Sequence, residues 1–161
     1  MQEKGWHSRG YLPHFDGKRV FQALTFRLHD SLPKKVIEQW KNELSQLTEK
    51  AARIQLQQKI SHYEDAGHGS CLLKNPKFAE LVQNALLHFD GERYRLLEWV
   101  IMPNHLHALI ETKDEPLPKI IKSWKSHTAR QINLAHGKEG SIWARDYHLS
   151  LIHISEPTRP Y

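Results

Sequence analysis

The spacing of hydrophobic residues changes several times along this chain, and each change predicts a new element. Two continuous apolar runs, at residues 96–102 and 106–110, flank a Pro-Asn pair. Runs of this kind predict two buried antiparallel strands, with Pro103 and Asn104 in the turn between them. A first strand is predicted over residues 18–28. The remaining predicted elements are helices over residues 33–60, 76–89 and 119–135, and a short strand over residues 141–144 with Trp143 buried.

This order of elements predicts an α+β protein with an antiparallel sheet of about four strands and helices packed mainly on one face. The long helix over residues 33–60 carries a narrow apolar stripe and a charged back. The stripe is typical of core packing. It also suits an arm that packs on a second copy of the chain, so a homodimer is the alternative interpretation. Residues 1–17 are polar and contain three aromatic residues, which predicts a frayed arm that covers the core.

Candidate chemistry lies in the second strand of the central pair, at His105-Leu106-His107. Side chains alternate along a strand, so both imidazoles point the same way, with their Cα atoms about 7 Å apart. That spacing suits two ligands of one metal ion, and ordinary packing of two histidines is the alternative interpretation. His68, which lies between Gly67 and Gly69, is interpreted as a loop residue rather than as a third ligand.

Composition narrows the class of protein. The 161 residues are 39% hydrophobic and 25% charged, which fits one soluble domain with a real core. No apolar run is long enough to span a membrane, and the single cysteine, Cys71, suits a reducing cytoplasm. We therefore expect a cytoplasmic protein without membrane contact. The net charge of +5 is compatible with a polyanionic partner but does not require one.

The stretch MPNHLHALIE, residues 102–111, resembles the signature of the HUH single-tyrosine transposases, and in particular their REP-associated tyrosine transposase branch. Residues 9–33, 67–94, 123–133 and 141–148 also resemble segments of that family, in the same order. The resemblance implies a ferredoxin-like fold with His105 and His107 on a central strand. It also implies a divalent metal ion, Mg²⁺ or Mn²⁺, held by this pair. It further implies a nucleoid-associated protein whose partner is single-stranded or hairpin DNA.

In this family a tyrosine attacks a DNA phosphodiester and forms a 5′-phosphotyrosine intermediate. The resemblance also suggests residues that contact DNA. Arg9 would meet a phosphate or a base edge, and Tyr11 would stack on a base. Lys122, Lys125 and Arg130 would line a basic surface of the helix over residues 119–135, although a solvated helix face explains these charges equally well.

The last stretch, LSLIHISEPTRPY, departs from the family pattern and resembles the translation of a sequencing-library adapter. We expect residues 1–148 to form an HUH transposase-like domain that is incomplete at its C-terminus, and residues 149–161 to be non-native. The family's next helix carries the nucleophilic tyrosine and a further metal ligand. We therefore expect this chain to be inactive in cleavage. The alternatives are a non-catalytic module that binds hairpin DNA, and a metal-binding protein unrelated to DNA.

Overall fold

The structure, a computed structural model, describes residues 5–9, 12–16 and 21–151. Two short strands come first, β1 (Gly5–Arg9) and β2 (Leu12–Asp16), and they pair with each other. The elements that follow are β3 (Phe21–Leu28), α1 (Lys34–Glu43), α2 (Glu49–Asp65), the 3₁₀ turn η1 (Leu72–Lys74), α3 (Pro76–His88), β4 (Tyr94–Ile101), β5 (His105–Thr112), α4 (Leu117–His136) and β6 (Trp143–Leu151).

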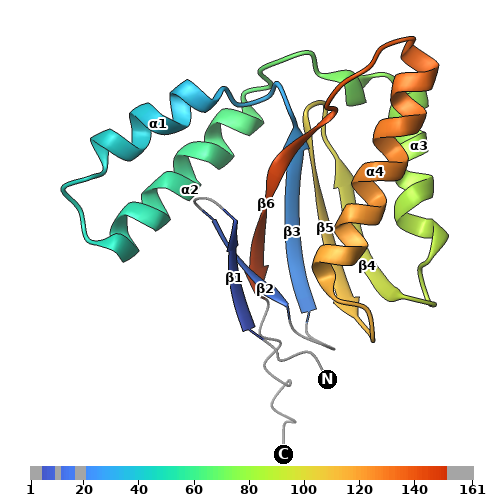
Figure 1. Ribbon diagram of the computed structural model, residues 1–161, viewed down its shortest axis with the longest axis horizontal. Helices are drawn as coiled ribbons and strands as arrows, with labels where there is room; N and C mark the ends of the chain where they lie inside the picture. The colour runs from blue at the N-terminus through green and yellow to red at the C-terminus, as the bar shows by residue number, and fades with distance from the viewer. Residues whose placement is uncertain (1–4, 10–11, 17–20, 152–161) are drawn as a thin grey trace, which may run out of the picture.

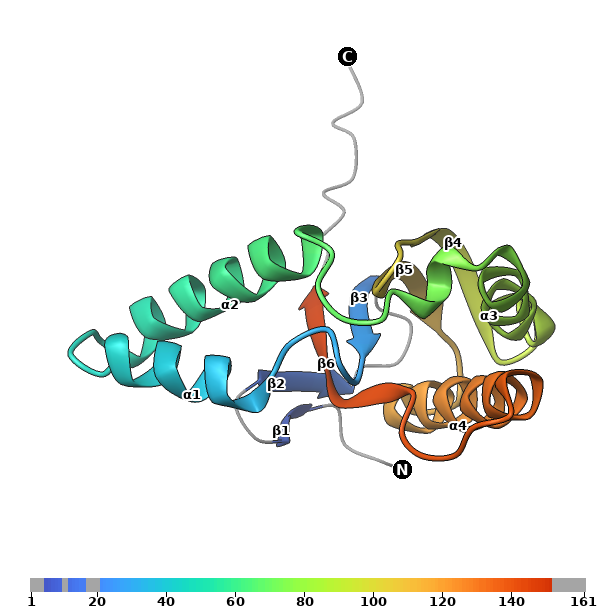
Figure 2. The same cartoon turned by 90° about the horizontal axis from the view of Figure 1, so that it is seen from above.

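The main sheet has the strand order β4-β5-β3-β6, and every neighbouring pair is antiparallel (Figure 1). Helix α3 connects β3 to β4, and α4 connects β5 to β6, so these elements make a βαββαβ arrangement of ferredoxin-like order. Both connecting helices lie on one side of the sheet, whereas α1 and α2 lie on the other side and project away from it (Figure 2). The predicted α+β class, with a four-stranded antiparallel sheet, is confirmed.

The core lies between the sheet and the pair α3 and α4. Alternate residues of β5, Leu106, Ala108 and Ile110, are at most 3% exposed and face these helices. Helix α4 contributes the residues that its helical spacing predicts, which are Ile120, Ile121, Trp124, Thr128 and Ile132, all buried. Because side chains alternate along a strand, His105 and His107 are placed on the opposite face of β5.

The helix predicted over residues 33–60 is wrong in one respect, because the chain breaks it into α1 and α2. The hydroxyl of Thr48 accepts a hydrogen bond from the backbone N–H of Ala51, at 3.3 Å, and so caps the start of α2. The two helices pack on each other around their own small core: Leu32, Ile37, Leu44, Leu56 and Ile60. The break turns Leu47 and Ile54 outward, to 40% and 51% exposure, although both belong to the predicted stripe.

Two predictions near the chain ends also need correction. Residues 5–9 and 12–16 are not an irregular arm, because they form the paired strands β1 and β2, and β2 lies against β6. The final strand is longer than predicted, since β6 continues along β3 until Leu151 pairs with Gln22. Trp143 is buried as predicted, at 7% exposure. Leu149 pairs with Leu24, so the start of the segment predicted to be non-native belongs to the sheet, and residues 152–161 lie outside the described residues.

Candidate metal centre

His105 and His107 lie on the same face of β5, as the strand periodicity predicts. Their ring centroids are 4.9 Å apart, and the two ring planes are nearly perpendicular. His105 is 1% exposed, and His107 is half-buried. The pair is therefore held on the face of the sheet that α3 and α4 leave uncovered.

A third side chain joins the pair from the last residue of α2. One ligand atom from each of Asp65, His105 and His107 lies within 4.8 Å of the other two. The carboxylate Oδ1 of Asp65 is 3.5 Å from Nε2 of His105. Helix α2 is fixed to this face by a buried ion pair, in which Glu64 lies 3.6 Å from Arg27 of β3. These contacts place two imidazoles and one carboxylate around a common point.

Hydrogen bonds at Nδ1 hold each ring, so the partner of each ring lies on the side away from Nε2. Nδ1 of His105 is 2.7 Å from Oδ1 of Asn104, and Nδ1 of His107 is 2.7 Å from the hydroxyl of Thr25. Asn104 is itself fixed, because its Nδ2 donates to the carbonyl of His68 at 3.1 Å. Metal-binding histidines are usually oriented in this way, by a polar group on the nitrogen that does not bind the metal.

Burial keeps the two imidazoles neutral, which metal binding requires. It lowers the pKa of His105 and of His107, and the nearby His107 lowers the pKa of His105 further, while Asp65 opposes both shifts. Burial also raises the pKa of Glu64 to about 7, against the opposing effect of Arg27. His148, a third imidazole on this face, also has a lowered pKa, first because it is buried and then because His107 is near.

The donor set fits a metal ion. Nε2 of His105 is buried and has no hydrogen-bond partner, although an acceptor carboxylate faces it. An unprotonated nitrogen and a carboxylate oxygen repel each other unless a cation or a proton lies between them. Ligand atoms lie about 2.0–2.2 Å from a bound ion, so a set within 4.8 Å needs only a small closure to surround one.

The sequence did not reveal Asp65. It lies forty residues before His105 in the chain, at the end of a helix whose length was itself predicted incorrectly. Only the tertiary position of α2 brings it to the histidines. His68, the alternative considered from the sequence, stacks on Tyr63 at 4.0 Å between ring centroids and offers its backbone carbonyl to Asn104. Its imidazole is not part of the group formed by Asp65, His105 and His107.

A groove of about 320 Å³ runs beside His107 on the same open face of the sheet. Its floor is mostly apolar, and its lining includes Thr25, Val100, Leu109 and His148. Val100 is 46% exposed, which is unusual for a valine within a sheet.

The basic residues predicted to contact DNA do not gather at this groove. Lys122 and Arg130 are exposed on α4, on the other face of the sheet (Figure 2). Lys125 donates to the backbone carbonyls of Ala144 and Arg145, at 2.8 and 3.3 Å, and so ties α4 to β6. The backbone of Arg9 lies in β1, and Tyr11 lies outside the described residues.

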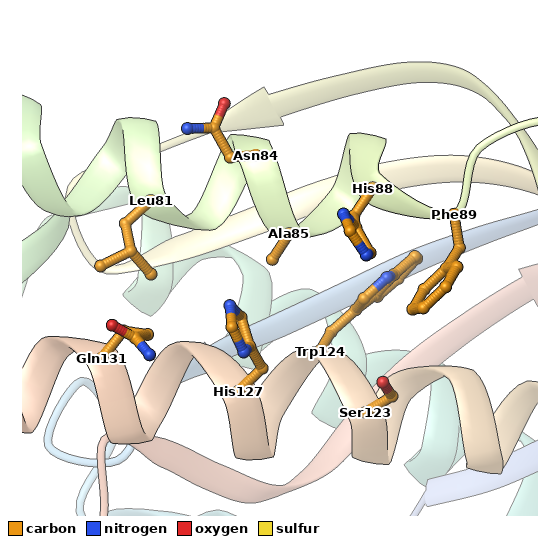
Figure 3. Close-up of a pocket in the computed structure, with 9 residues that line it drawn as sticks. All are labelled: Leu81, Asn84, Ala85, His88, Phe89, Ser123, Trp124, His127 and Gln131. Carbon is orange, nitrogen blue, oxygen red and sulfur yellow. The ribbon is translucent and has the colours of Figure 1, made fainter.

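A larger hollow of about 610 Å³ lies between α3 and α4, on the opposite side of the sheet from the histidine pair. His88 and His127 extend into it from the two helices, beside Asn84 and Gln131 (Figure 3). No carboxylate or cysteine lines it. This hollow is therefore not part of the group formed by Asp65, His105 and His107.

Comparison with known proteins defines the class. The family model described as "Transposase IS200 like" matches residues 73–157, which is more than half of the chain. The matched segment contains β4, β5 and α4, and therefore both histidines of the candidate metal centre. This chain belongs to the IS200-like transposase family. No curated protein matches it.

One solved structure supports the fold, and a second similar structure is reported with it. A structure described as a REP-associated tyrosine transposase bound to a REP hairpin is 15% identical, with a TM-score of 0.50, and covers 96% of this chain and 64% of that one. The chain thus spans 64% of the length of that protein. A protein of Deinococcus radiodurans R1 assigned as a transposase is 16% identical, with a TM-score of 0.38, and covers 95% of this chain and 88% of that one. In the described part of the chain, no helix is long and apolar enough to cross a membrane.

Proposed function

We propose that this chain is the metal-holding domain of a transposase that acts on single-stranded DNA carrying a hairpin. The observation that carries the proposal is the convergence of Asp65, His105 and His107 on the open face of the sheet, in a member of the IS200-like transposase family. Two imidazoles and a carboxylate can hold a divalent cation, and the resemblance to HUH transposases favours Mn²⁺ or Mg²⁺, with substrate oxygens and water as the remaining ligands. When bound, such an ion would polarise a scissile phosphate and stabilise negative charge that develops on it.

The chain's own residues would orient the metal ligands and bind DNA. Asn104 and Thr25 hold the two imidazoles through Nδ1, so that neither partner occupies Nε2. The groove beside His107 would take an unpaired nucleotide next to the phosphate. The hairpin-bound relative, which shares this fold, supports hairpin DNA as the partner.

We further propose that the described residues of this chain supply no nucleophile for DNA cleavage. Tyr94 and Tyr147 are 1% and 3% exposed, and both belong to the core on the other face of the sheet from the histidines. Tyr63 packs its ring against Trp40 and His68. None of these tyrosines is offered to a phosphate held in the groove, so a nucleophile would have to come from outside the described residues.

Fluorescence anisotropy with a labelled hairpin that has single-stranded flanks tests the proposal, in the presence and absence of Mn²⁺. We expect binding that Mn²⁺ tightens in the wild type but not in a variant that combines His105→Ala with His107→Ala. The affinity should fall with salt, with a log–log slope of about −0.7 for each phosphate contact to single-stranded DNA. Equal affinity with and without Mn²⁺ would instead support a non-catalytic binding module. Absence of binding at low salt would contradict a DNA-related function.

A further inference from the structure

The proton of a neutral histidine lies on one of its two ring nitrogens, and the partner at Nδ1 decides which one. His105 and His107 have different partners at Nδ1. For His105 the structure fixes the answer. Oδ1 of Asn104 can only accept a hydrogen bond, and the amide cannot turn around without losing the bond from its Nδ2 to the carbonyl of His68. Nδ1 of His105 therefore carries the proton, and the lone pair lies on Nε2, which faces Asp65.

For His107 the partner at Nδ1 is a hydroxyl, and a hydroxyl can either donate or accept. If Thr25 donates to Nδ1, the proton of a neutral His107 lies on Nε2, and Nε2 cannot bind a cation. If Thr25 accepts from Nδ1, Nε2 is free, but the hydroxyl proton then needs another acceptor. In the described part of the chain, the hydroxyl of Thr25 makes no second hydrogen bond.

A third imidazole lies on the far side of Thr25. The sheet register pairs Thr25 of β3 with His107 of β5 on one side and with His148 of β6 on the other. Residues directly opposite each other on antiparallel strands share a face, with Cβ atoms about 4.5–5.5 Å apart. All three residues line the same groove. Nδ1 of His148 is buried and has no hydrogen-bond partner, so this ring places an unpaired nitrogen next to a hydroxyl that needs an acceptor.

We propose that His148 is a positioning residue whose Nδ1 accepts a hydrogen bond from the hydroxyl of Thr25. Thr25 then accepts from Nδ1 of His107, and Nε2 of His107 is left free for a cation. This inference rests on the proposed metal function of His107. It requires only rotation of the hydroxyl and of the His148 ring about single bonds, and no covalent bond is made or broken. Hydrogen bonds from His107 through Thr25 to His148 would thus fix the tautomer of His107, as the hydrogen bond to Asn104 fixes the tautomer of His105.

Nitrogen-15 NMR of the imidazoles in the metal-free chain tests the proposal directly, because it shows which nitrogen of a neutral ring is protonated. We expect Nδ1–H for both His105 and His107 in the wild type. In His148→Phe, which keeps a ring but removes the acceptor, His107 should shift toward Nε2–H while His105 stays unchanged as the internal control. His148→Gln, which restores an acceptor oxygen, should restore the wild-type signal of His107.

Metal titration provides the second measurement. Loss of a group that orients a metal ligand typically weakens metal binding about 10–100-fold, and we expect His148→Phe to weaken Mn²⁺ binding by about tenfold. Thr25→Val should weaken Mn²⁺ binding by a similar factor. The two substitutions together should weaken it no more than either alone, because both break the same chain of hydrogen bonds from His107 through Thr25 to His148. If His107 carries its proton on Nε2 in the wild type, or stays Nδ1–H in His148→Phe, the proposal is wrong. Since the NMR experiment uses no metal, it decides this point separately from metal binding.

Discussion

At the scale of single residues, the site depends on small groups that orient larger ones. Asn104 follows Pro103 in the turn between β4 and β5, and the sequence assigned it only a turn role. In the fold it is 1% exposed and joins two segments, through its side-chain oxygen to His105 and its side-chain nitrogen to the carbonyl of His68. A residue that the sequence assigns to a turn therefore also sets the proton position of His105, the proposed metal ligand.

Asn104→Ala should weaken Mn²⁺ binding by about 10–100-fold, because Nδ1 of His105 loses the acceptor that fixes its tautomer. The free energy of unfolding should fall by roughly 1–3 kcal/mol, since buried polar groups lose their partners. Isothermal titration with Mn²⁺ and urea denaturation measure the two effects. Asn133→Ala is the matched control, because its side chain also donates to a loop carbonyl, that of Gly140, but lies far from the histidines in α4. Equal Mn²⁺ affinity in the two variants would contradict this role of Asn104.

At the scale of elements, Tyr94 joins the two core helices to the sheet. From β4, its hydroxyl donates to the carbonyl of Leu86 in α3 and accepts from the indole N–H of Trp124 in α4. The ring is 1% exposed and packs edge-on against Trp124. Burial raises the pKa of this hydroxyl, although the hydrogen bond from Trp124 opposes the shift.

A raised pKa in the folded state means that the stability contributed by Tyr94 is fully present below the unfolded value of about 10 and is lost as the pH rises above it. Tyr94→Phe should cost roughly 1–3 kcal/mol of unfolding free energy at pH 7, because two buried polar groups lose their partner. The difference between wild type and variant should shrink above pH 10. Urea denaturation of both proteins between pH 7 and pH 11 measures it, and a difference that stays constant or grows with pH would contradict the argument.

The elements also show how much of the fold the sequence could predict. The βαββαβ order and the shared face of His105 and His107 follow from local periodicity, which depends only on neighbours in the chain. The break between α1 and α2 does not, because Leu47 and Ile54 continue the apolar spacing and yet are exposed. The position of Asp65 cannot be predicted from local patterns either, because tertiary packing decides it. Its place depends on how α2 packs, including the buried ion pair between Glu64 and Arg27.

At the scale of the whole molecule, the sheet separates two surfaces. One is covered by α3 and α4 (Figure 2). The other carries Asp65, His105, His107 and the groove beside His107. Lys122 and Arg130 lie on the covered side. DNA that contacts both these residues and the histidines would therefore have to pass around an edge of the sheet.

The chain as given should form no covalent adduct with hairpin-bearing single-stranded DNA in the presence of Mn²⁺, because the buried hydroxyls of Tyr94 and Tyr147 cannot reach a phosphate on the open face. Denaturing gel electrophoresis with labelled DNA checks this expectation. An adduct that persists in Tyr63→Phe would place the nucleophile at Tyr11 or Tyr161. An adduct that disappears in Tyr63→Phe would place it on α2. Either result would contradict the expectation.

That residues 149–161 are non-native stays a prediction. Leu149 is buried against β3, so the sheet accepts the first residue of this segment, whatever its origin. Resequencing the gene across the codon for His148 tests the prediction. We expect the native reading frame to diverge from LSLIHISEPTRPY after that codon. Continuous genomic DNA that encodes this segment would show that it is native.

The central claim is that Asp65, His105 and His107 hold one divalent cation, and Mn²⁺ titration of Asp65→Ala tests it most directly. The substitution lies on the exposed end of α2, so it should leave the fold intact, and Asp114→Ala in the loop before α4 is a matched control. We predict one Mn²⁺ site in the wild type and in Asp114→Ala, with at least a tenfold weaker site in Asp65→Ala. Equal Mn²⁺ affinity in all three proteins would contradict the claim.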